Sequence, residues 1–250
     1  MKVSIITATY NSNKFLETCI CSVMAQDYPD IEYILIDGGS TDSTQSIINK
    51  YSNNIVKWIS EPDTGIYDAI NKGIKLASGD IVGVLNSDDF FSDDSVISRI
   101  VKSFKDDEAL EIVYADVSFV VRENINKSVR HYSSRYFRPY MFKFGFQPAH
   151  PSLYVKRGLF EKFGYYRTDL KIAGDFELLL RFLLKNKLSY KYISDVWVKM
   201  RIGGVSTSGI KSILQINNEI IKAHKINGIY TNIIFTYSKY IVKWWGFLRK

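Results

Sequence analysis

The sequence has few cysteines, no long apolar run and no glycine motif for phosphate, and each absence excludes a class of protein. Its two cysteines, Cys19 and Cys21, are two positions apart in a predicted helix. Their side chains therefore diverge, and neither a disulfide nor a chelate is expected. No stretch reaches the roughly 18 apolar residues of a membrane-spanning helix, and Met1-Lys2 leads directly into a strand-like run without a signal sequence. We therefore expect a cytoplasmic protein.

Two nucleotide-binding signatures are also missing. The G-x-G-x-x-G fingerprint is absent after the first predicted strand, where Thr7-Ala8-Thr9-Tyr10-Asn11 stands instead. This argues against a dehydrogenase, and no P-loop lysine pattern occurs either. The chain has no internal repeat and no low-complexity stretch. With 250 residues, 46% of them hydrophobic, it is large enough for one α/β domain with a C-terminal addition.

Acidic residues are missing from the C-terminal part of a chain whose net charge is +7. Residues 220–250 contain no Asp or Glu, and their basic residues are Lys222, Lys225, Lys239, Lys243, Arg249 and Lys250. Apolar residues recur among them at three- and four-residue steps, namely Ile233, Ile234, Tyr237, Tyr240, Ile241, Trp244, Trp245 and Leu248. The pattern is typical of a helix at an anionic membrane surface, but also of a terminal helix packed on the body with its lysines facing water. Nucleic acid is not expected as a partner, because no binding motif accompanies the charge.

The first half of the chain alternates predicted strands and helices. Strands are predicted at 3–7, 31–36 and 56–59, and a fourth begins at Asp80 and ends in Asn86-Ser87-Asp88-Asp89. Helices are predicted from Asn11 or Ser12 to Gln26, from Asp42 or Ser43 to Tyr51, and from Gly65 to just before Gly79. Such a succession implies a parallel sheet with right-handed crossovers and helices on both faces.

The second half is less regular. Strands are predicted at 111–116, 119–122, 190–193 and 196–200, and a helix begins at Gly174. Residues 124–145, rich in Arg, Tyr and Phe, are predicted to run over the surface. Residues 203–208 are a flexible loop by composition.

Several carboxylates fall at predicted strand ends on one side of the sheet, where ligands of open α/β sheets bind. They are Asp37, Asp42, Asp63, Asp88 and Asp89. Adjacent carboxylates such as Asp88 and Asp89 repel each other, and a cation between them removes the repulsion. Their oxygen atoms suit Mg²⁺ or Mn²⁺, which would carry the phosphates of a nucleotide. The alternative is a polar turn or a helix cap without a metal ion.

Five short motifs in register resemble the inverting family-2 glycosyltransferases of the GT-A fold. They are Thr7-Ala8-Thr9-Tyr10-Asn11, Asp37-Gly38-Gly39-Ser40-Thr41-Asp42, the stretch from Asp63 to Gly73, Asn86-Ser87-Asp88-Asp89 and Gly174-Asp175. The likeness covers about residues 2–206 and is closest to bacterial enzymes that build O-antigen, capsule or exopolysaccharide. It implies a GT-A-like, mostly parallel α/β domain over 1–208, with a nucleotide-sugar-binding half (1–116) and an acceptor half (117–208). A basic amphipathic helical segment (209–250) follows.

The resemblance also implies a role for particular residues. Those expected on the nucleotide-sugar side are Thr7, Thr9, Asn11, Asp37, Asp63, Asp68, Asn86, Ser87, His150 and Arg201. Asp63 and Asp68 are alternatives for the uridine side. Arg201, with a closing loop at 203–206, would neutralise the diphosphate. Asp42 is expected to cap its helix instead.

The family's metal motif is Asp-x-Asp, and this chain has Asn86-Ser87-Asp88 in its place. The resemblance implies that Asp88, with Asp89 as the second candidate, holds Mg²⁺ or Mn²⁺ against the donor phosphates. Asp175 matches the family's catalytic base, which takes the proton of the acceptor hydroxyl as that oxygen attacks the sugar carbon. The alternative for Asp175 is a helix carboxylate without a chemical task, and for His150 a structural histidine.

The activity implied is transfer of a hexose, with inversion, from a nucleotide-diphosphate sugar, expected to be a UDP-sugar. The expected acceptor is a polyprenyl-diphosphate-linked saccharide at the inner face of the plasma membrane, where the enzyme would be peripheral. Two alternatives remain at this point. One is a non-catalytic nucleotide- or carbohydrate-binding subunit of a polysaccharide assembly complex, and the other is a nucleotidyltransferase on a similar scaffold.

Overall fold

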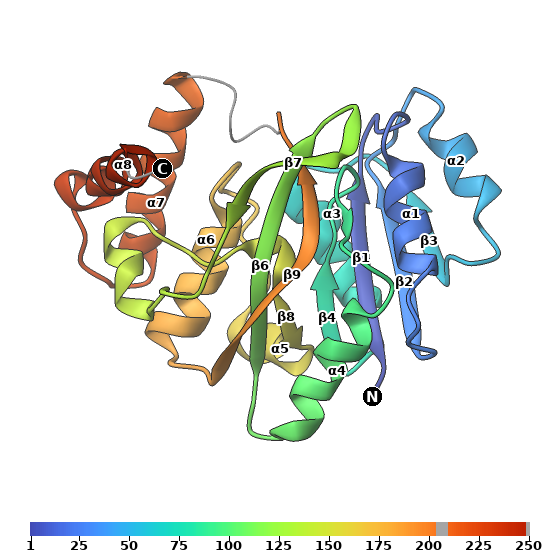
Figure 1. Ribbon diagram of the computed structural model, residues 1–250, viewed down its shortest axis with the longest axis horizontal. Helices are drawn as coiled ribbons and strands as arrows, with labels where there is room; N and C mark the ends of the chain where they lie inside the picture. The colour runs from blue at the N-terminus through green and yellow to red at the C-terminus, as the bar shows by residue number, and fades with distance from the viewer. Residues whose placement is uncertain (204–209, 249–250) are drawn as a thin grey trace.

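A computed structural model describes residues 1–203 and 210–248 of the chain, with residues 210 and 241–248 placed by their backbone alone. One nine-stranded sheet runs through the molecule, and helices cover both of its faces (Figure 1). Each face has its own cluster of buried apolar side chains. The predicted α/β class with helices on both faces is therefore confirmed.

The first half of the chain forms the predicted alternating unit. Its elements are β1 (Val3–Thr9), α1 (Leu16–Met24), β2 (Ile31–Asp37), α2 (Thr44–Lys50), β3 (Lys57–Ser60), α3 (Ile66–Leu76) and β4 (Ile81–Val84). These four strands are parallel, with β1 between β2 and β4 and with β3 outside β2. Because parallel strands end at the same edge of a sheet, the loops that follow them gather at that edge.

The second half extends the sheet with strands in both directions. Its elements are β5 (Phe90–Phe91), α4 (Val96–Asp106), β6 (Ile112–Val121), β7 (Asn124–Tyr132), η1 (Pro139–Phe144), η2 (His150–Ser152), β8 (Tyr154–Lys156), α5 (Gly158–Phe163), α6 (Gly174–Leu179), η3 (Leu180–Lys185) and β9 (Tyr190–Arg201). The strand order is β3-β2-β1-β4-β8-β6-β9-β5, and β7 pairs with β6. β8 is antiparallel to both β4 and β6, so the sheet is mixed on this side.

Two strand predictions for the second half are wrong in detail, and the predicted surface segment is exposed but contains a strand that was not predicted. The strand pairs predicted at 111–122 and 190–200 are single strands, because a shift of register near Asp116 bends the ladder between β6 and β9 without ending it. The segment predicted to run over the surface from residue 124 contains β7, an exposed strand paired with β6. Of the predicted flexible loop, residues 204–208 lie outside the described residues.

The loop before α1 replaces the predicted start of that helix. Asn11 has a left-handed backbone (φ 47°), and its side-chain oxygen accepts a hydrogen bond from the Thr41 N–H at 2.9 Å. This geometry delays the helix to Leu16. The N-cap position of α2 is Ser43, and Asp42 just before it accepts a hydrogen bond from the Thr44 N–H at 2.9 Å, which agrees with a role for Asp42 at the start of the helix.

The two cysteines behave as predicted and form no disulfide. Cys19 is buried in α1, and Cys21 is exposed on the same helix. Burial raises the pKa of the Cys19 thiol to about 12, so the side chain stays protonated. It serves as apolar filling between α1 and the sheet.

Two helices, α7 (Ile210–Ile226) and α8 (Ile233–Leu248), follow the sheet. α7 packs on α6 and on α8, and α8 also packs on η1. Thr236 and Lys239 are buried, so the lysine expected to face water at this position does not. No helix in the described part of the chain is both long and apolar enough to cross a bilayer.

Glu32 of β2 is a buried anchor at the edge of the sheet where the parallel strands begin. It accepts hydrogen bonds from the Ser4 hydroxyl at 2.6 Å and the Ser78 N–H at 2.7 Å, and Lys2 and Lys57 each lie 3.4 Å away. Burial alone would raise the pKa of Glu32, but these partners hold it at about 2, below the usual 4.5.

A depressed folded-state pKa stabilises the protein above the pKa of the unfolded chain, and this contribution disappears as the pH falls through 2. We expect Glu32→Gln to lower the free energy of unfolding by about 2 kcal/mol at pH 7, measured by urea denaturation. The difference from wild type should shrink as the pH falls below 4. Glu123→Gln, at an exposed site, is the control and should change nothing. If the difference in unfolding free energy between the two proteins stayed constant across pH, the charge of Glu32 would not be what stabilises the fold.

Candidate active site

Side-chain hydrogen bonds tie together the loops that leave β1, β2 and β4. The Asn11 N–H donates to the Ser40 hydroxyl at 2.8 Å, and the hydroxyls of Ser12 and Ser87 are 2.9 Å apart. Asn11 and Ser87 therefore hold neighbouring loops in register at the edge where the parallel strands end. Their direct contact with a nucleotide stays a prediction.

Asp37 at the end of β2 organises the loop that follows it. It is fully buried, and it accepts hydrogen bonds from the hydroxyl and the N–H of Ser40. The hydroxyl of Ser60, at the end of β3, donates to it at 2.6 Å. The carboxylate thus fixes the loop that starts at Gly38, and its predicted contact with base or ribose stays a prediction.

Asp63 and Asp68 were alternatives, and the structure separates them. A Cβ atom on Gly38 would overlap the Asp63 carboxylate and lie 3.5 Å from the Tyr10 ring, so these three residues adjoin one another. Asp68 instead accepts from the Thr64 N–H at 3.1 Å and lies 3.7 Å from Lys72, as in an ordinary first helical turn. Asp63 is therefore the carboxylate at the strand-end edge.

Tyr10 is a residue of this edge that the sequence interpretation missed. Its ring is 62% exposed although it directly follows the buried strand β1. An exposed aromatic ring beside Gly38 and Asp63 offers a flat apolar surface for a planar ligand. The signal in the sequence was a large aromatic residue at a strand end.

The two threonines of β1 have different environments. The Thr7 hydroxyl is buried, donates to the Leu85 carbonyl at 2.9 Å and accepts from the Tyr33 hydroxyl at 3.1 Å. Thr7 therefore packs in the core, and the interpretation that it borders the nucleotide pocket is corrected. Thr9, at the very end of the strand, has a buried hydroxyl with no hydrogen-bond partner among the described residues. A polar atom of a ligand would supply the hydrogen bond that this hydroxyl lacks.

The turn after β4 brings two carboxylates together, as predicted. Asp89 is buried and accepts a hydrogen bond from the Asn86 amide at 3.0 Å. Burial and the neighbouring charge of Asp88 raise the pKa of Asp89 to about 8. Asp88 is only partly buried, and its carbonyl oxygen accepts a hydrogen bond from the Arg201 guanidinium.

These residues fit a divalent cation that shares its ligands with a substrate. The described residues contain no group of three or more His, Cys, Asp or Glu side chains that would hold a metal ion by themselves. Asp88 and Asp89 supply two carboxylates, and Asn86 supplies an amide oxygen. Mg²⁺ and similar ions commonly bind one or two carboxylates and complete their coordination with water and substrate phosphates. A cation bound here would favour the charged form of Asp89, which burial and Asp88 disfavour in its absence.

Two arginines lie beside this carboxylate pair. Arg201 is buried with its guanidinium 4.8 Å from the Phe15 ring centroid and 5.0 Å from that of Phe90. Arg122 lies 4.7 Å from the same Phe15 ring. Among the described residues neither arginine forms an ion pair with a carboxylate. Two guanidinium groups around one ring repel each other, and an anion between them would relieve that repulsion.

Arg122 is a second residue that sequence reasoning missed. It follows β6 directly, and β6 pairs with β9 so that Val120 lies opposite Arg201. Residues two apart on paired strands point to the same side of the sheet, which brings Arg122 next to Arg201. Only the register between β6 and β9 reveals this, and the sequence does not contain it.

Asp175 lies in the first turn of α6 and is held from three sides. Its carboxylate accepts hydrogen bonds from the Gln147 amide at 2.9 Å, the Tyr67 hydroxyl at 3.4 Å and the Phe176 N–H at 2.8 Å. An ionised carboxylate only accepts, so the NH₂ group of Gln147 must be the end that faces it. Gln147, part of a segment that sequence analysis left without a role, is thus a direct partner of Asp175.

Tyr67 of α3 joins Asp175 to the strand-end edge. The single proton of its hydroxyl is directed mainly to the Ile172 carbonyl at 2.7 Å, so the contact with Asp175 at 3.4 Å is the weaker branch of a shared hydrogen bond. Burial, with the Asp175 charge, raises the pKa of Tyr67 so that it stays protonated. A Cβ atom on Gly174 would come within 2.6 Å of the Tyr67 ring. The absence of a side chain at Gly174 is therefore what lets α3 and α6 meet here.

His150 belongs to the same group of residues but has a partner of its own. Its Nε2 atom lies 2.8 Å from the Tyr166 hydroxyl. Burial lowers the pKa of His150, and the Asp175 charge partly offsets this, so the imidazole is neutral at neutral pH. These contacts agree with a structural histidine, and its contact with a donor sugar stays a prediction.

Both groups of residues face the same edge of the sheet. Asp88 and Asp89 follow β4, and η2, which carries His150, packs against β4 and β6 just before the chain enters β8. Tyr67 lies in the first turn of α3, directly after the loop of Asp63. The convergence expected for the carboxylates of both halves is thus supported by topology.

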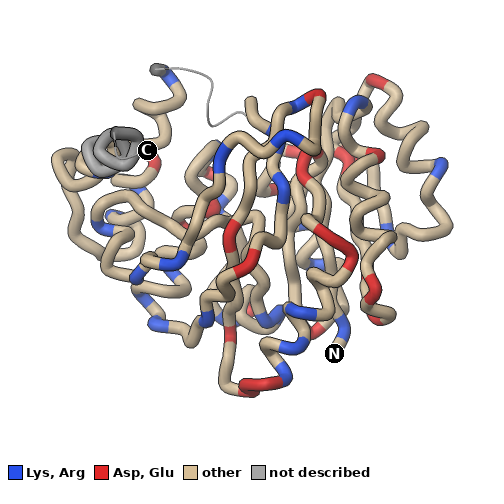
Figure 2. The backbone as a smooth tube through the Cα atoms, viewed as in Figure 1, with Lys and Arg blue, Asp and Glu red and all other residues tan. Residues whose placement is uncertain are grey.

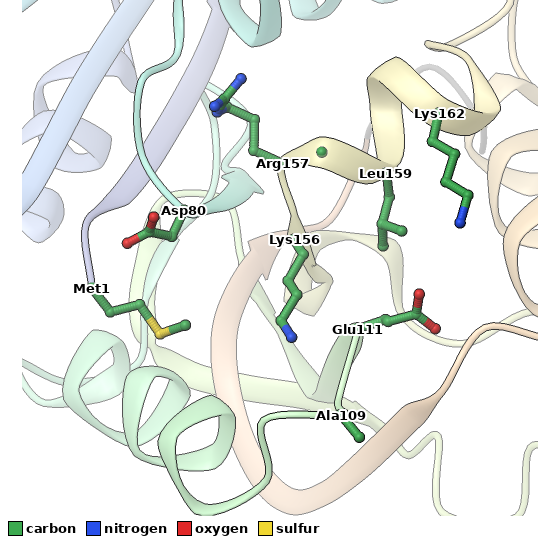
Figure 3. Close-up of a pocket in the computed structure, with 9 residues that line it drawn as sticks. Met1, Asp80, Ala109, Glu111, Lys156, Arg157, Leu159 and Lys162 are labelled. Atoms are coloured by element: carbon green, nitrogen blue, oxygen red, sulfur yellow. The ribbon is translucent and has the colours of Figure 1, made fainter.

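One cavity lies away from this edge of the sheet. It measures about 650 Å³ and is lined by residues that include Met1, Asp80, Glu111 and Lys156 (Figure 3). These residues lie where β1, β4 and β6 begin, at the edge opposite Asp88. This cavity contains none of the predicted site residues.

Comparison with known proteins places this arrangement in a family. The model of the Glycosyl transferase family 2 matches residues 4–163. A PGL/p-HBAD biosynthesis glycosyltransferase of Mycobacterium tuberculosis is 29% identical over 209 residues, which is 82% of this chain and 79% of that protein. An uncharacterized glycosyltransferase of the same species is 34% identical over 182 residues, 72% of this chain and 68% of that protein.

Solved structures show the same fold. S. aureus TarS (residues 1–349) superimposes with a TM-score of 0.68 at 21% identity over 89% of this chain, which spans 65% of the TarS structure. The mannosyltransferase PcManGT of Pyrobaculum calidifontis gives a TM-score of 0.61 at 21% identity, over 88% of this chain and 64% of that one. The fold is that of the GT-A glycosyltransferases. The chain belongs to Glycosyl transferase family 2.

The contact between Tyr67 and Gly174 gives a test of the link between the two halves. Gly174→Ala would force the ring away from α6, and we expect it to cost about 2 kcal/mol of unfolding free energy and to displace Asp175. Gly158→Ala is the matched control, because Gly158 also begins a helix and a Cβ there meets nothing within 4 Å. Denaturation curves of both variants measure this. Equal stability of both variants would contradict a close contact at Gly174.

Proposed function

We propose that this protein is a metal-dependent, inverting transferase that moves a hexose from a UDP-sugar to a lipid-linked saccharide during surface-glycan biosynthesis. The observation that supports the proposal is that Asp175 contacts Gln147 and Tyr67 on the side of the sheet edge where the turn with Asp88 and Asp89 follows β4. TarS has been solved with UDP-GlcNAc, and PcManGT with GDP-Man and Mn²⁺, which supports a nucleotide-sugar donor and a divalent cation.

The donor would bind along the strand-end edge. Tyr10 would stack on the base, and Asp63 and the Thr9 hydroxyl would satisfy its polar groups or those of the ribose. Asp88 and Asp89, with Asn86 as a neutral ligand, would hold Mg²⁺ or Mn²⁺, which supplies charge neutralisation for the leaving diphosphate. Arg122 and Arg201 would add two further positive charges there.

Asp175 would act as the general base on the acceptor side. Inversion in one displacement requires a carboxylate that accepts the acceptor's hydroxyl proton while the oxygen attacks the sugar carbon opposite the diphosphate. Gln147 and the protonated Tyr67 each donate to Asp175 and so hold it in one orientation. Gln147 and Tyr67 each direct an N–H or O–H group at a different oxygen of the Asp175 carboxylate. Of these three side chains, Asp175 is therefore the one that can take up a proton.

The acceptor and the place of action are part of the proposal. A polyprenyl-diphosphate-linked saccharide at the inner face of the plasma membrane follows from the likeness of the sequence motifs to enzymes of O-antigen, capsule or exopolysaccharide synthesis. A relative named for PGL/p-HBAD biosynthesis supports a role in glycan assembly without specifying the same acceptor.

A panel of nucleotide sugars, tested by thermal shift with and without Mn²⁺ and then by product formation, examines the proposal directly. We expect a UDP-sugar to raise the melting temperature, more so with Mn²⁺, and to be consumed when a saccharide lipid is added. Binding without turnover on any acceptor would favour a non-catalytic subunit. Release of pyrophosphate from a nucleoside triphosphate would favour a nucleotidyltransferase.

Asp175→Asn isolates the base. We expect kcat to fall about 1000-fold because the amide cannot take a proton, while the Kd for the UDP-sugar stays within about twofold. Glu161→Gln is the control, a first-turn carboxylate of α5 outside the site. Steady-state kinetics and calorimetry measure both quantities. An unchanged kcat would remove Asp175 from the mechanism.

Arg122→Gln tests the second positive charge at the diphosphate. We expect the Kd for UDP to rise about tenfold, because one charge-assisted contact is lost. Arg130→Gln, on the strand that follows, is the matched control, since Arg130 stacks on Phe119 at 4.0 Å. If both variants bind UDP equally well, Arg122 does not contact the diphosphate.

A further inference from the structure

Two segments far apart in the chain contain no acidic residue. Residues 124–160 have no Asp or Glu, and their basic residues are Lys127, Arg130, Arg135, Arg138, Lys143, Lys156 and Arg157. Residues 220–250 likewise have none, as noted above. Surfaces of ordinary globular proteins mix both signs of charge, so two such segments in one chain are unusual.

The fold places these two segments against each other. The Thr231 hydroxyl, in the turn between α7 and α8, donates to the Lys143 carbonyl at 2.7 Å. The Phe144 ring at the end of η1 lies 5.1 Å from the Phe235 ring in the first turn of α8. Figure 1 shows α7 and α8 together at the end of the molecule opposite α2. In Figure 2 the tube over residues 124–160 carries blue segments and no red.

Large apolar side chains are exposed on the same contact region. Tyr136, Tyr140, Tyr230, Ile233 and Ile234 are each 59–77% exposed. With the exposed basic residues Arg135, Lys143 and Lys225 they form what we call the η1–α8 surface. Single exposed apolar residues are normal, but adjacent isoleucines beside three exposed tyrosines and an unbalanced positive charge indicate a binding surface.

The η1–α8 surface is connected to the proposed base by two rings. Phe142 of η1 is buried and packs on Phe176 at 5.2 Å, and Phe176 directly follows Asp175 in α6. A partner bound at this surface would therefore lie beside the half of the protein that carries the base.

We propose that the η1–α8 surface docks on an anionic lipid bilayer. Tyrosine rings are favoured at the level of lipid headgroups, isoleucine side chains enter the acyl boundary, and Lys and Arg attract anionic headgroups. A nucleic acid or another polyanion would use the charge but not the isoleucines, and a second copy of this chain would meet its own positive charge. The inference rests on the proposed function and deepens it, because it names the surface by which the enzyme would reach the membrane. Vesicle binding is measured without the transfer reaction, so the two proposals can fail separately.

Cosedimentation of the whole chain with vesicles tests the inference. We expect binding to vesicles of phosphatidylcholine and phosphatidylglycerol, much weaker binding to phosphatidylcholine alone, and a decrease with added salt. The double variant Ile233→Asn with Ile234→Asn and the double variant Arg135→Gln with Lys143→Gln should each reduce partitioning about tenfold. Transfer to a water-soluble acceptor should be unchanged in both, which separates docking from catalysis.

Matched controls lie on other faces of the molecule. Val56→Asn changes an exposed apolar residue between α2 and β3, and Lys105→Gln changes an exposed basic residue of α4. Both should bind vesicles as wild type does. Absence of wild-type binding to phosphatidylglycerol vesicles, or equal loss in the controls, would overturn the inference. The inference would also be overturned if sedimentation velocity showed a wild-type dimer that the isoleucine variant dissociates, while neither protein binds vesicles.

Discussion

The contact between Tyr67 and Gly174 is the interaction on which the rest of the site depends. It joins α3, which follows the donor-side loops, to α6, which carries Asp175. The same tyrosine donates to Ile172 and Asp175, so packing and hydrogen bonding act on one side chain. The contact therefore holds the start of α6, with Asp175, against α3.

Like charges are grouped in pairs at the edge of the sheet where the parallel strands end. Asp88 and Asp89 repel each other, and Arg122 and Arg201 surround one Phe15 ring without a direct ion pair to a carboxylate among the described residues. Asp89 and Arg201 are buried, and buried charges are costly unless they are paired. A cation with a diphosphate would pair both sets at once. Under the proposed function, this arrangement would favour binding of the ligand over stability of the free protein.

The sequence predicted what depends on local pattern and missed what depends on register. The alternation of strands and helices up to β4 and the carboxylates after it followed from apolar periodicity and strand ends. Thr7 and Thr9 share one side of β1, yet Thr7 lies one level deeper and is covered by Tyr33, which alternation alone does not reveal. The pairing of β6 with β9 places Arg122 beside Arg201, and tertiary packing places Gln147 beside Asp175. Lys239, expected in water, is buried because η1 covers α8.

A crystal structure of the protein with UDP and Mn²⁺, with the metal located by its anomalous signal, tests the central claim most directly. The account predicts one Mn²⁺ bound by Asp88 or Asp89 and by the diphosphate, with Asp175 facing the same cleft across a gap that fits a sugar ring. A metal ion bound elsewhere, or Asp175 opening onto a different cleft from the diphosphate, would contradict it.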